Sequence, residues 1–114
     1  MSQLDKEALD AIEGVISNAL STPEGSAKIV HACNYLEHEM TRHHFNTERA
    51  FEVFSIAVDN AVWANVKDRD VYAIYKQSRL GPQMAKALTE QFIARTGAKD
   101  QRPTKRWFRG FLGS

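Results

Sequence analysis

The sequence predicts an all-α fold, a compact bundle of four to five helices followed by a basic-aromatic C-terminal tail or short helix. Apolar residues recur at spacings of three and four through most of the chain, as they do in helices that bury one face. No stretch alternates apolar and polar residues with a period of two, so we expect no strand. Proline, glycine and short polar stretches divide the pattern into segments of helical length.

The chain of 114 residues is long enough for one domain with its own core. We expect a helical bundle domain over residues 1–97 and, over residues 98–114, a linker followed by the basic-aromatic segment. Cys33 is the only cysteine, which excludes a disulfide within the chain and favours a cytoplasmic location. No secretory signal is expected, and Glu52 and Asp59 interrupt the most apolar run, so we expect no transmembrane segment.

The first two expected helices are separated by the polar stretch STPEGS. Ser2 is the expected N-cap of the first helix, whose apolar residues recur at helical spacing up to that stretch. Thr22 is expected to cap the second helix, and Pro23 would occupy its first position, where the missing N–H costs nothing. This second helix is expected to end at Arg42 or His43.

The third expected helix covers residues 47–66, with Asn46 or Thr47 as its cap, and is apolar on almost all sides. A helix of this kind packs on two sides or more, so we expect it at the centre of the bundle, with Trp63 in the core. Surplus apolar surface on this helix would also suit a homodimer. Its expected polar stripe consists of Glu48, Glu52, Ser55 and Asp59.

A short fourth helix is expected to follow the polar turn KDRD and to end at a Gly81-Pro82 break. Tyr75 and Arg79, four residues apart, are expected to stack on the surface of this helix. The fifth helix would begin at Pro82 and end before Gly97, which suits a helix C-terminus.

Charge is distributed unevenly along the sequence. Residues 1–65 contain four lysines and arginines against ten acidic residues, whereas residues 66–114 contain eleven against four. One interpretation of this uneven charge is an anionic partner for the basic half. The other is that the acidic and basic halves neutralise each other, within one molecule or between two. Charge alone leaves both interpretations open.

The end of the chain combines large apolar side chains with bases. On a helix, the large apolar side chains would lie on one side. Gly110 would weaken that helix, so the segment needs a surface on which to fold. Four surfaces remain open: the chain's own bundle, a protein partner, nucleic acid and an anionic membrane. The apolar group is Trp107, Phe108, Phe111 and Leu112, and the bases are Lys105, Arg106 and Arg109.

These features predict a non-catalytic protein–protein interaction module, a small adaptor, regulator or inhibitor, that binds a protein partner through its basic C-terminal half. An acidic partner would complement the charge of this half. No enzyme activity and no cofactor are expected. The alternative is a nucleic-acid-binding protein, in which the fourth and fifth helices form a helix-turn-helix outline and the tail adds contacts. In that outline Gln83, Lys86 and Thr89 would enter the major groove, and Lys76 and Arg79 would contact phosphate. The expected partner-binding residues are Arg79, Lys86, Arg95, Arg102, Lys105, Arg106, Trp107, Phe108, Arg109 and Phe111.

Metal binding must be considered because all four histidines lie within residues 31–44. His31 and His38 are seven residues apart, about 10.5 Å along a helix axis, which is too far to share one ion. The HExxH box of zinc proteases does not fit either, because Arg42 stands where its second histidine would be. We therefore expect no metal site, and either solvated histidines or a pH-sensitive interface. Cys33 lies on the apolar side of the second helix, where a thiol stays protonated.

Overall fold

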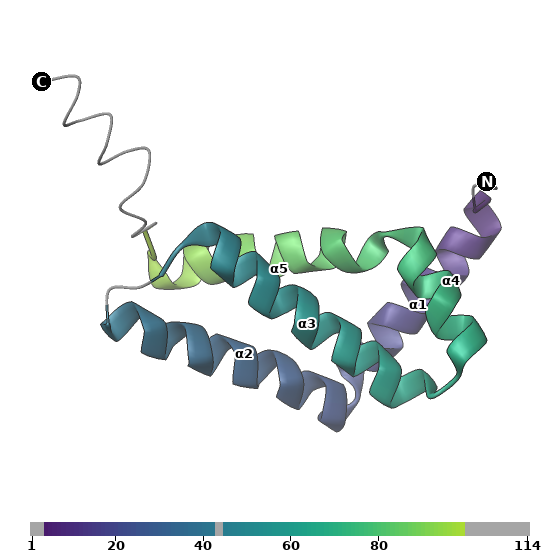
Figure 1. Cartoon of the computed structure of the whole chain (residues 1–114), viewed down its shortest axis with the longest axis horizontal. Helices are drawn as coiled ribbons and strands as arrows, with labels where there is room; N and C mark the ends of the chain where they lie inside the picture. The colour runs from purple at the N-terminus through teal and green to yellow at the C-terminus, as the bar shows by residue number, and fades with distance from the viewer. Residues whose placement is uncertain (1–3, 43–44, 100–114) are drawn as a thin grey trace, which may run out of the picture.

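The computed structural model of the chain describes residues 4–42 and 45–99, which form five α-helices and no strand (Figure 1). The predicted all-α bundle is therefore confirmed, whereas the predicted C-terminal tail lies outside the described residues. The helices are α1 (Lys6–Ser21), α2 (Pro23–Thr41), α3 (Thr47–Val66), α4 (Arg69–Ser78) and α5 (Leu80–Thr96).

Polar side chains placed directly before each helix explain where the first three helices begin. Asp5, not Ser2 as predicted, caps α1, and its carboxylate accepts the Ala8 N–H at 2.8 Å. An acid at this position also interacts favourably with the positive end of the helix dipole. Thr22 caps α2 as predicted, and of the two candidates for α3, Asn46 and Thr47, the cap is Asn46; both side chains accept backbone N–H groups of their helices.

The α1–α2 turn is tight because one residue, Thr22, serves both helices. Its hydroxyl donates to the Ala19 carbonyl at 2.9 Å and accepts the Gly25 N–H at the same distance. A side chain at position 25 would collide with the Ala19 carbonyl, whose carbon would lie 2.9 Å from an added Cβ. Only glycine therefore fits at this point of the turn.

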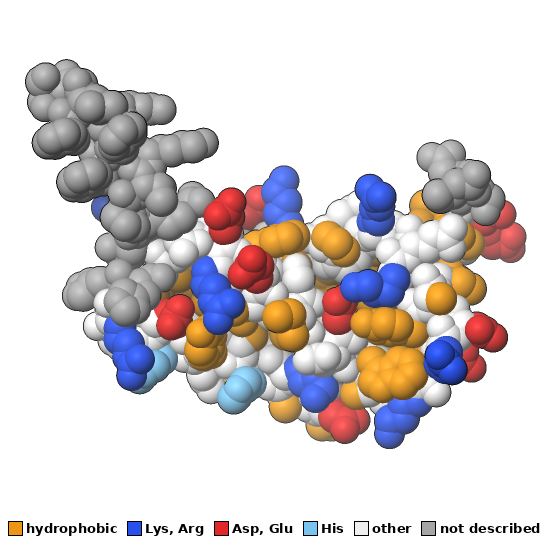
Figure 2. Space-filling view, viewed as in Figure 1, with side chains coloured by type: hydrophobic (Ala, Val, Ile, Leu, Met, Phe, Trp, Pro, Cys, Tyr) orange, Lys and Arg blue, Asp and Glu red, His pale blue; other side chains and the backbone are white. Residues whose placement is uncertain are grey.

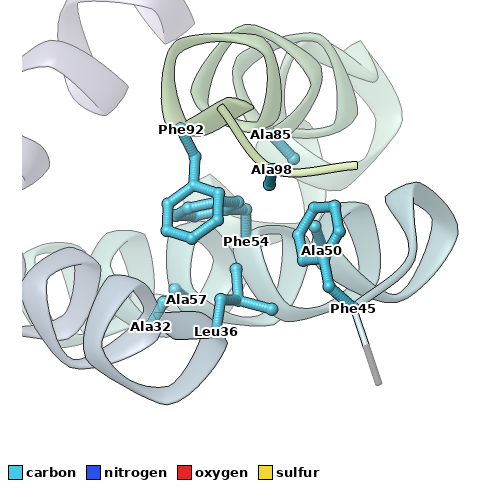
Figure 3. Close-up of a cluster of buried hydrophobic side chains, with 9 residues drawn as sticks. All are labelled: Ala32, Leu36, Phe45, Ala50, Phe54, Ala57, Ala85, Phe92 and Ala98. Carbon is cyan, nitrogen blue, oxygen red and sulfur yellow. The ribbon is translucent and has the colours of Figure 1, made fainter. Parts of the chain in front are cut away.

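Helix α3 lies at the centre of the bundle and contacts each of the other helices (Figure 1). On one side, the ring of Phe92 in α5 lies 5.8 Å from Phe45 and 6.1 Å from Phe54 between ring centroids (Figure 3). On the other side, a second cluster joins α1, α3 and α4. The second cluster consists of Ile12, Ile16, Ala19, Val58, Val62 and Tyr75.

The prediction that Trp63 is in the core is wrong, because this side chain is 42% exposed. Nine residues separate it from the buried Phe54, which is half a turn out of phase at 3.6 residues per turn. Trp63 therefore lies on the outward side of α3. There its ring meets the edge of Tyr72 from α4 at 5.4 Å between centroids.

The connection between α4 and α5 differs from the prediction. The break falls at Arg79, in the left-handed region with φ of 62°, and α5 begins at Leu80. Pro82 fits inside the first turn because no helical hydrogen bond needs its N–H. Gly81 lies against Tyr75, whose Cζ would be 2.8 Å from an added Cβ. Tyr75 is only 1% exposed, so the predicted surface stacking of Tyr75 on Arg79 is wrong.

The end of α5 was predicted correctly: Gly97 has a φ of 72°, and its N–H donates to the Ile93 carbonyl. None of the helices in the described part of the chain is long and apolar enough to cross a membrane.

Candidate functional site

A groove of about 690 Å³ runs between α2 and α3. Ala32, Ala57 and Val53 provide apolar surface, while charged and polar groups also line it. Figure 2 shows this face, with hydrophobic side chains along α3 between groups of opposite charge. The lining residues are Glu24, Ala27, Lys28, His31, Ala32 and Tyr35 of α2, and Arg49, Val53, Ile56, Ala57 and Asn60 of α3.

The two helices present matching rows of side chains to this groove. On α2 the row is Glu24, Lys28, His31 and Tyr35, and on α3 it is Arg49, Val53, Ile56 and Asn60. Each row steps by four, three and four residues, which keeps its members on one side of a helix. The groove is thus a direct product of the helical period in two segments.

Three large apolar side chains remain exposed at and beside this groove: Tyr35 at 37%, Ile56 at 58% and Trp63 at 42%. Ile56 and Trp63 are seven residues apart, so they lie on the same side of α3, two turns from each other. We call Tyr35, Ile56 and Trp63 the α2–α3 patch. An apolar patch with a polar rim is a common feature of surfaces that bind other proteins.

Arg49 holds Tyr35 at one end of the groove. Its guanidinium lies 5.5 Å from the centre of the Tyr35 ring, and Nη2 donates to the Tyr35 hydroxyl at 2.8 Å. This hydrogen bond raises the pKa of Arg49 above its usual value. A weaker ion pair joins Arg49 to Glu52 at 3.6 Å. Arg49 thus contacts both the ring and the hydroxyl of Tyr35 at the surface.

A hydrogen-bonded group beside Trp63 joins α3 to α4. The Tyr75 hydroxyl donates to Asp59 Oδ1 at 2.6 Å, and Lys76 Nζ donates to Asp59 Oδ2 at 2.9 Å. Tyr72 lies between the rings of Tyr75 and Trp63, 5.5 Å from the first and 5.4 Å from the second. Burial, and then the hydrogen bond to Asp59, raise the pKa of Tyr75 well above its usual range. The rings of Trp63, Tyr72 and Tyr75 thus form an aromatic row, of which Tyr75 is the buried member.

The predicted partner-binding residues do not form one surface in the described part of the chain. Arg79, Lys86 and Arg95 are all exposed. Lys86 and Arg95 are nine residues apart, which places them on opposite sides of α5. Arg95 also pairs with Glu37 of α2 at 3.2 Å. The remaining predicted residues lie outside the described residues: Arg102, Lys105, Arg106, Trp107, Phe108, Arg109 and Phe111.

The helix-turn-helix outline loses one of its five expected contacts. Thr89 is buried and donates its hydroxyl to the Ala85 carbonyl at 2.8 Å, so it does not face a DNA groove. Lys76 is paired with Asp59. Gln83, Lys86 and Arg79 remain exposed.

The histidine-rich stretch is divided between two surroundings. His31 lines the α2–α3 groove and His38 is exposed, whereas His43 and His44 lie outside the described residues. No group of three or more metal-binding side chains occurs within residues 4–42 and 45–99. Cys33 is half-buried, and this burial raises the pKa of its thiol.

Comparison with protein-family models, with curated proteins and with solved structures finds no match. Sequence reasoning missed the α2–α3 groove because it placed the binding surface in the basic half. The signal was present as the two matching rows, but each row alone resembles an ordinary helix side.

Proposed function

We propose that this chain is a non-catalytic, cytoplasmic interaction module, a small adaptor, regulator or inhibitor, that binds an apolar segment of a partner protein in the α2–α3 groove. The supporting observation is the exposure of Tyr35 and Ile56 in the groove and of Trp63 two turns further along the same side of α3. Tryptophan and tyrosine are among the residue types that dominate binding energy at protein interfaces.

Contacts made by two of these side chains add support. Arg49 holds Tyr35, and the aromatic row from Tyr75 through Tyr72 supports Trp63. A partner would therefore meet side chains that are already ordered, which reduces the entropy lost on binding.

Exposed bases in the C-terminal half of the sequence are available for a partner with acidic groups. Neither Arg79 nor Lys86 forms an ion pair within the described residues, and both are exposed. We propose that acidic groups of the partner meet these two bases.

A matched pair of substitutions tests the groove. Ile56→Glu places a charge in the groove, whereas Val30→Glu alters a side chain of similar exposure, 55% against 58%, outside it. A partner captured by the full chain is purified and titrated against both variants by calorimetry. We expect Ile56→Glu to weaken binding by roughly 30-fold or more, a change typical of a central interface residue, and Val30→Glu to leave it unchanged. Equal affinities for the two variants would remove the groove from the proposal.

Self-association through α3 is a second candidate, favoured by the exposure of Ile56 and Trp63 on this helix. Sedimentation equilibrium of the full chain over a wide concentration range measures it. A dimer that Ile56→Glu converts to a monomer, and Val30→Glu does not, would identify a second copy as the partner.

Nucleic-acid binding is the third candidate, favoured by the excess of bases in residues 66–114. Fluorescence anisotropy with labelled single-stranded and duplex DNA at increasing salt tests it. Affinity carried by phosphate contacts falls steeply as salt rises. Affinity that is absent at low salt would eliminate this candidate, whereas affinity that Lys86→Glu weakens and Ile56→Glu does not would favour it.

A further inference from the structure

A second groove, also of about 690 Å³, lies between α1 and the first half of α5. Ile16 and Leu20 of α1 and Met84 of α5 supply its apolar surface, and Asp10 and Glu13 of α1 line it as well. It shares no lining residue with the α2–α3 groove.

The charge of this second groove is one-sided. Asp10 and Glu13 are three residues apart on the same side of α1, and both are exposed. Neither carboxylate forms an ion pair within residues 4–42 and 45–99. Among the described residues, no lysine or arginine lines the groove. Its chemistry therefore suits a segment with apolar rings and nearby positive charges.

We infer that this groove is the docking site of the chain's own C-terminal segment, residues 103–112. That segment has the matching composition, because Trp107, Phe108 and Phe111 alternate with Lys105, Arg106 and Arg109. The rings fill the apolar surface between α1 and α5, and the bases meet Asp10 and Glu13. The inference concerns a different face from the proposed function, so each can fail without the other.

The chain is long enough for this arrangement. The described part ends at Lys99, and residues 100–106 can span roughly 23 Å when extended. Along α5, the distance from Thr96 back to Ala87 at the edge of the groove is roughly 14 Å at 1.5 Å per residue.

One side of α5 between its C-terminal end and the groove consists of uncharged residues. Ala87, Gln91 and Ala94 follow at spacings of four and three, so they lie on one side of the helix. None of the three is charged.

Fluorescence of Trp107 in the full chain tests the inference. The chain has two tryptophans, and Trp63→Phe leaves Trp107 as the only one. In this background we expect a blue-shifted emission maximum and weak quenching by acrylamide, because the indole is buried in the groove. Far-UV circular dichroism verifies that each variant remains folded.

Gly14 offers a direct way to fill the groove. A Cβ at this position meets nothing within 4 Å, so an arginine fits the bundle while it occupies the groove and adds positive charge. We expect Gly14→Arg to shift the Trp107 emission to that of an exposed indole and to raise the acrylamide quenching constant several-fold. Gly14→Ala is the control and leaves both values unchanged. The pair Asp10→Lys and Glu13→Lys should act like Gly14→Arg and provides an independent variant.

Three outcomes would overturn the inference. The first is solvent-like Trp107 emission in the Trp63→Phe chain itself. The second is a shift caused by Ile56→Arg in the α2–α3 groove and not by Gly14→Arg, which would place the segment on the other face. The third is an emission maximum that depends on protein concentration together with a dimer mass, which would place the segment in a second copy.

Discussion

At Tyr75 a single hydroxyl group joins two helices inside the bundle. The side chain is almost fully buried, yet its oxygen donates a 2.6 Å hydrogen bond to Asp59 of α3. Gly81 lies so close to the same hydroxyl that no larger residue fits there without a shift. The buried polar contact between α4 and α3 thus depends on this hydroxyl group and on the missing side chain at Gly81.

Tyr75→Phe is expected to lower the free energy of unfolding by about 1–3 kcal/mol, because the lost hydrogen bond is made to a charged group. Urea unfolding measures the change. Lys76→Met removes the second partner of Asp59, but this lysine is exposed, so the expected loss is below about 1 kcal/mol. A larger effect at Lys76 than at Tyr75 would contradict this account of the junction.

The same substitution should alter stability at high pH. Burial and the Asp59 hydrogen bond raise the folded-state pKa of Tyr75 above its usual 10.0, so the unfolded chain loses this proton first. The contribution of Tyr75 to the free energy of unfolding is complete below pH 10. It falls as the pH rises further, because the unfolded state then binds fewer protons than the folded state. Tyr75→Phe should therefore lose less stability than the parent between neutral pH and pH 11.

At the scale of the elements, two helix junctions rely on non-glycine residues in the left-handed region. Lys67 ends α3 with a φ of 51°, and Arg79 alone connects α4 to α5 with a φ of 62°. Side chains with a Cβ adopt this conformation at a cost of about 1–2 kcal/mol, which glycine avoids.

Lys67→Gly and Arg79→Gly are each expected to raise the free energy of unfolding by about 1 kcal/mol, as measured by thermal and urea unfolding. Lys86→Gly is the control, since this residue lies within α5, where glycine costs about 1 kcal/mol. Destabilisation at both junctions would show that contacts of the lost side chains outweigh the backbone strain.

At the scale of the whole molecule, α3 contacts each of the other four helices of the described chain. Phe54 is fully buried beside Phe92 of α5 (Figure 3). Ile56, two residues later, is 58% exposed. The two sides of α3 therefore serve different purposes: one holds the core together and the other carries the α2–α3 patch.

Phe54→Ala should remove about 3–5 kcal/mol of stability, a large share of the 5–15 kcal/mol typical of a domain. Ile56→Ala should change stability by less than about 0.5 kcal/mol. Circular dichroism and tryptophan fluorescence should report one shared transition in both variants. Separate transitions for the two probes would show that α4, beside Trp63, unfolds independently.

Local patterns were sufficient to predict most helix boundaries, but not the start of α1 or the break between α4 and α5. Thr22 with Pro23, Asn46 and Gly97 each mark a boundary through interactions with residues a few positions away, so the sequence alone reveals them. Spacing likewise predicted the central position of α3.

Contacts between distant residues could not be predicted in the same way. The exposure of Trp63 depends on how far α4 covers α3, and the burial of Tyr75 depends on Asp59, sixteen residues earlier. The groove was missed for the same reason, because it exists only where two helices lie side by side. Arg95 was assigned to a partner, whereas its carboxylate neighbour is Glu37 of the same chain.

The lone thiol of Cys33 has a practical consequence. It is half-buried on α2 with Arg95 of α5 beside it, and its raised pKa leaves little thiolate at neutral pH. A thiol-reactive dye will therefore label the native protein slowly and will react faster whenever α2 and α5 separate. The rate of labelling thus measures how often the bundle opens locally around Cys33, with no engineered cysteine required.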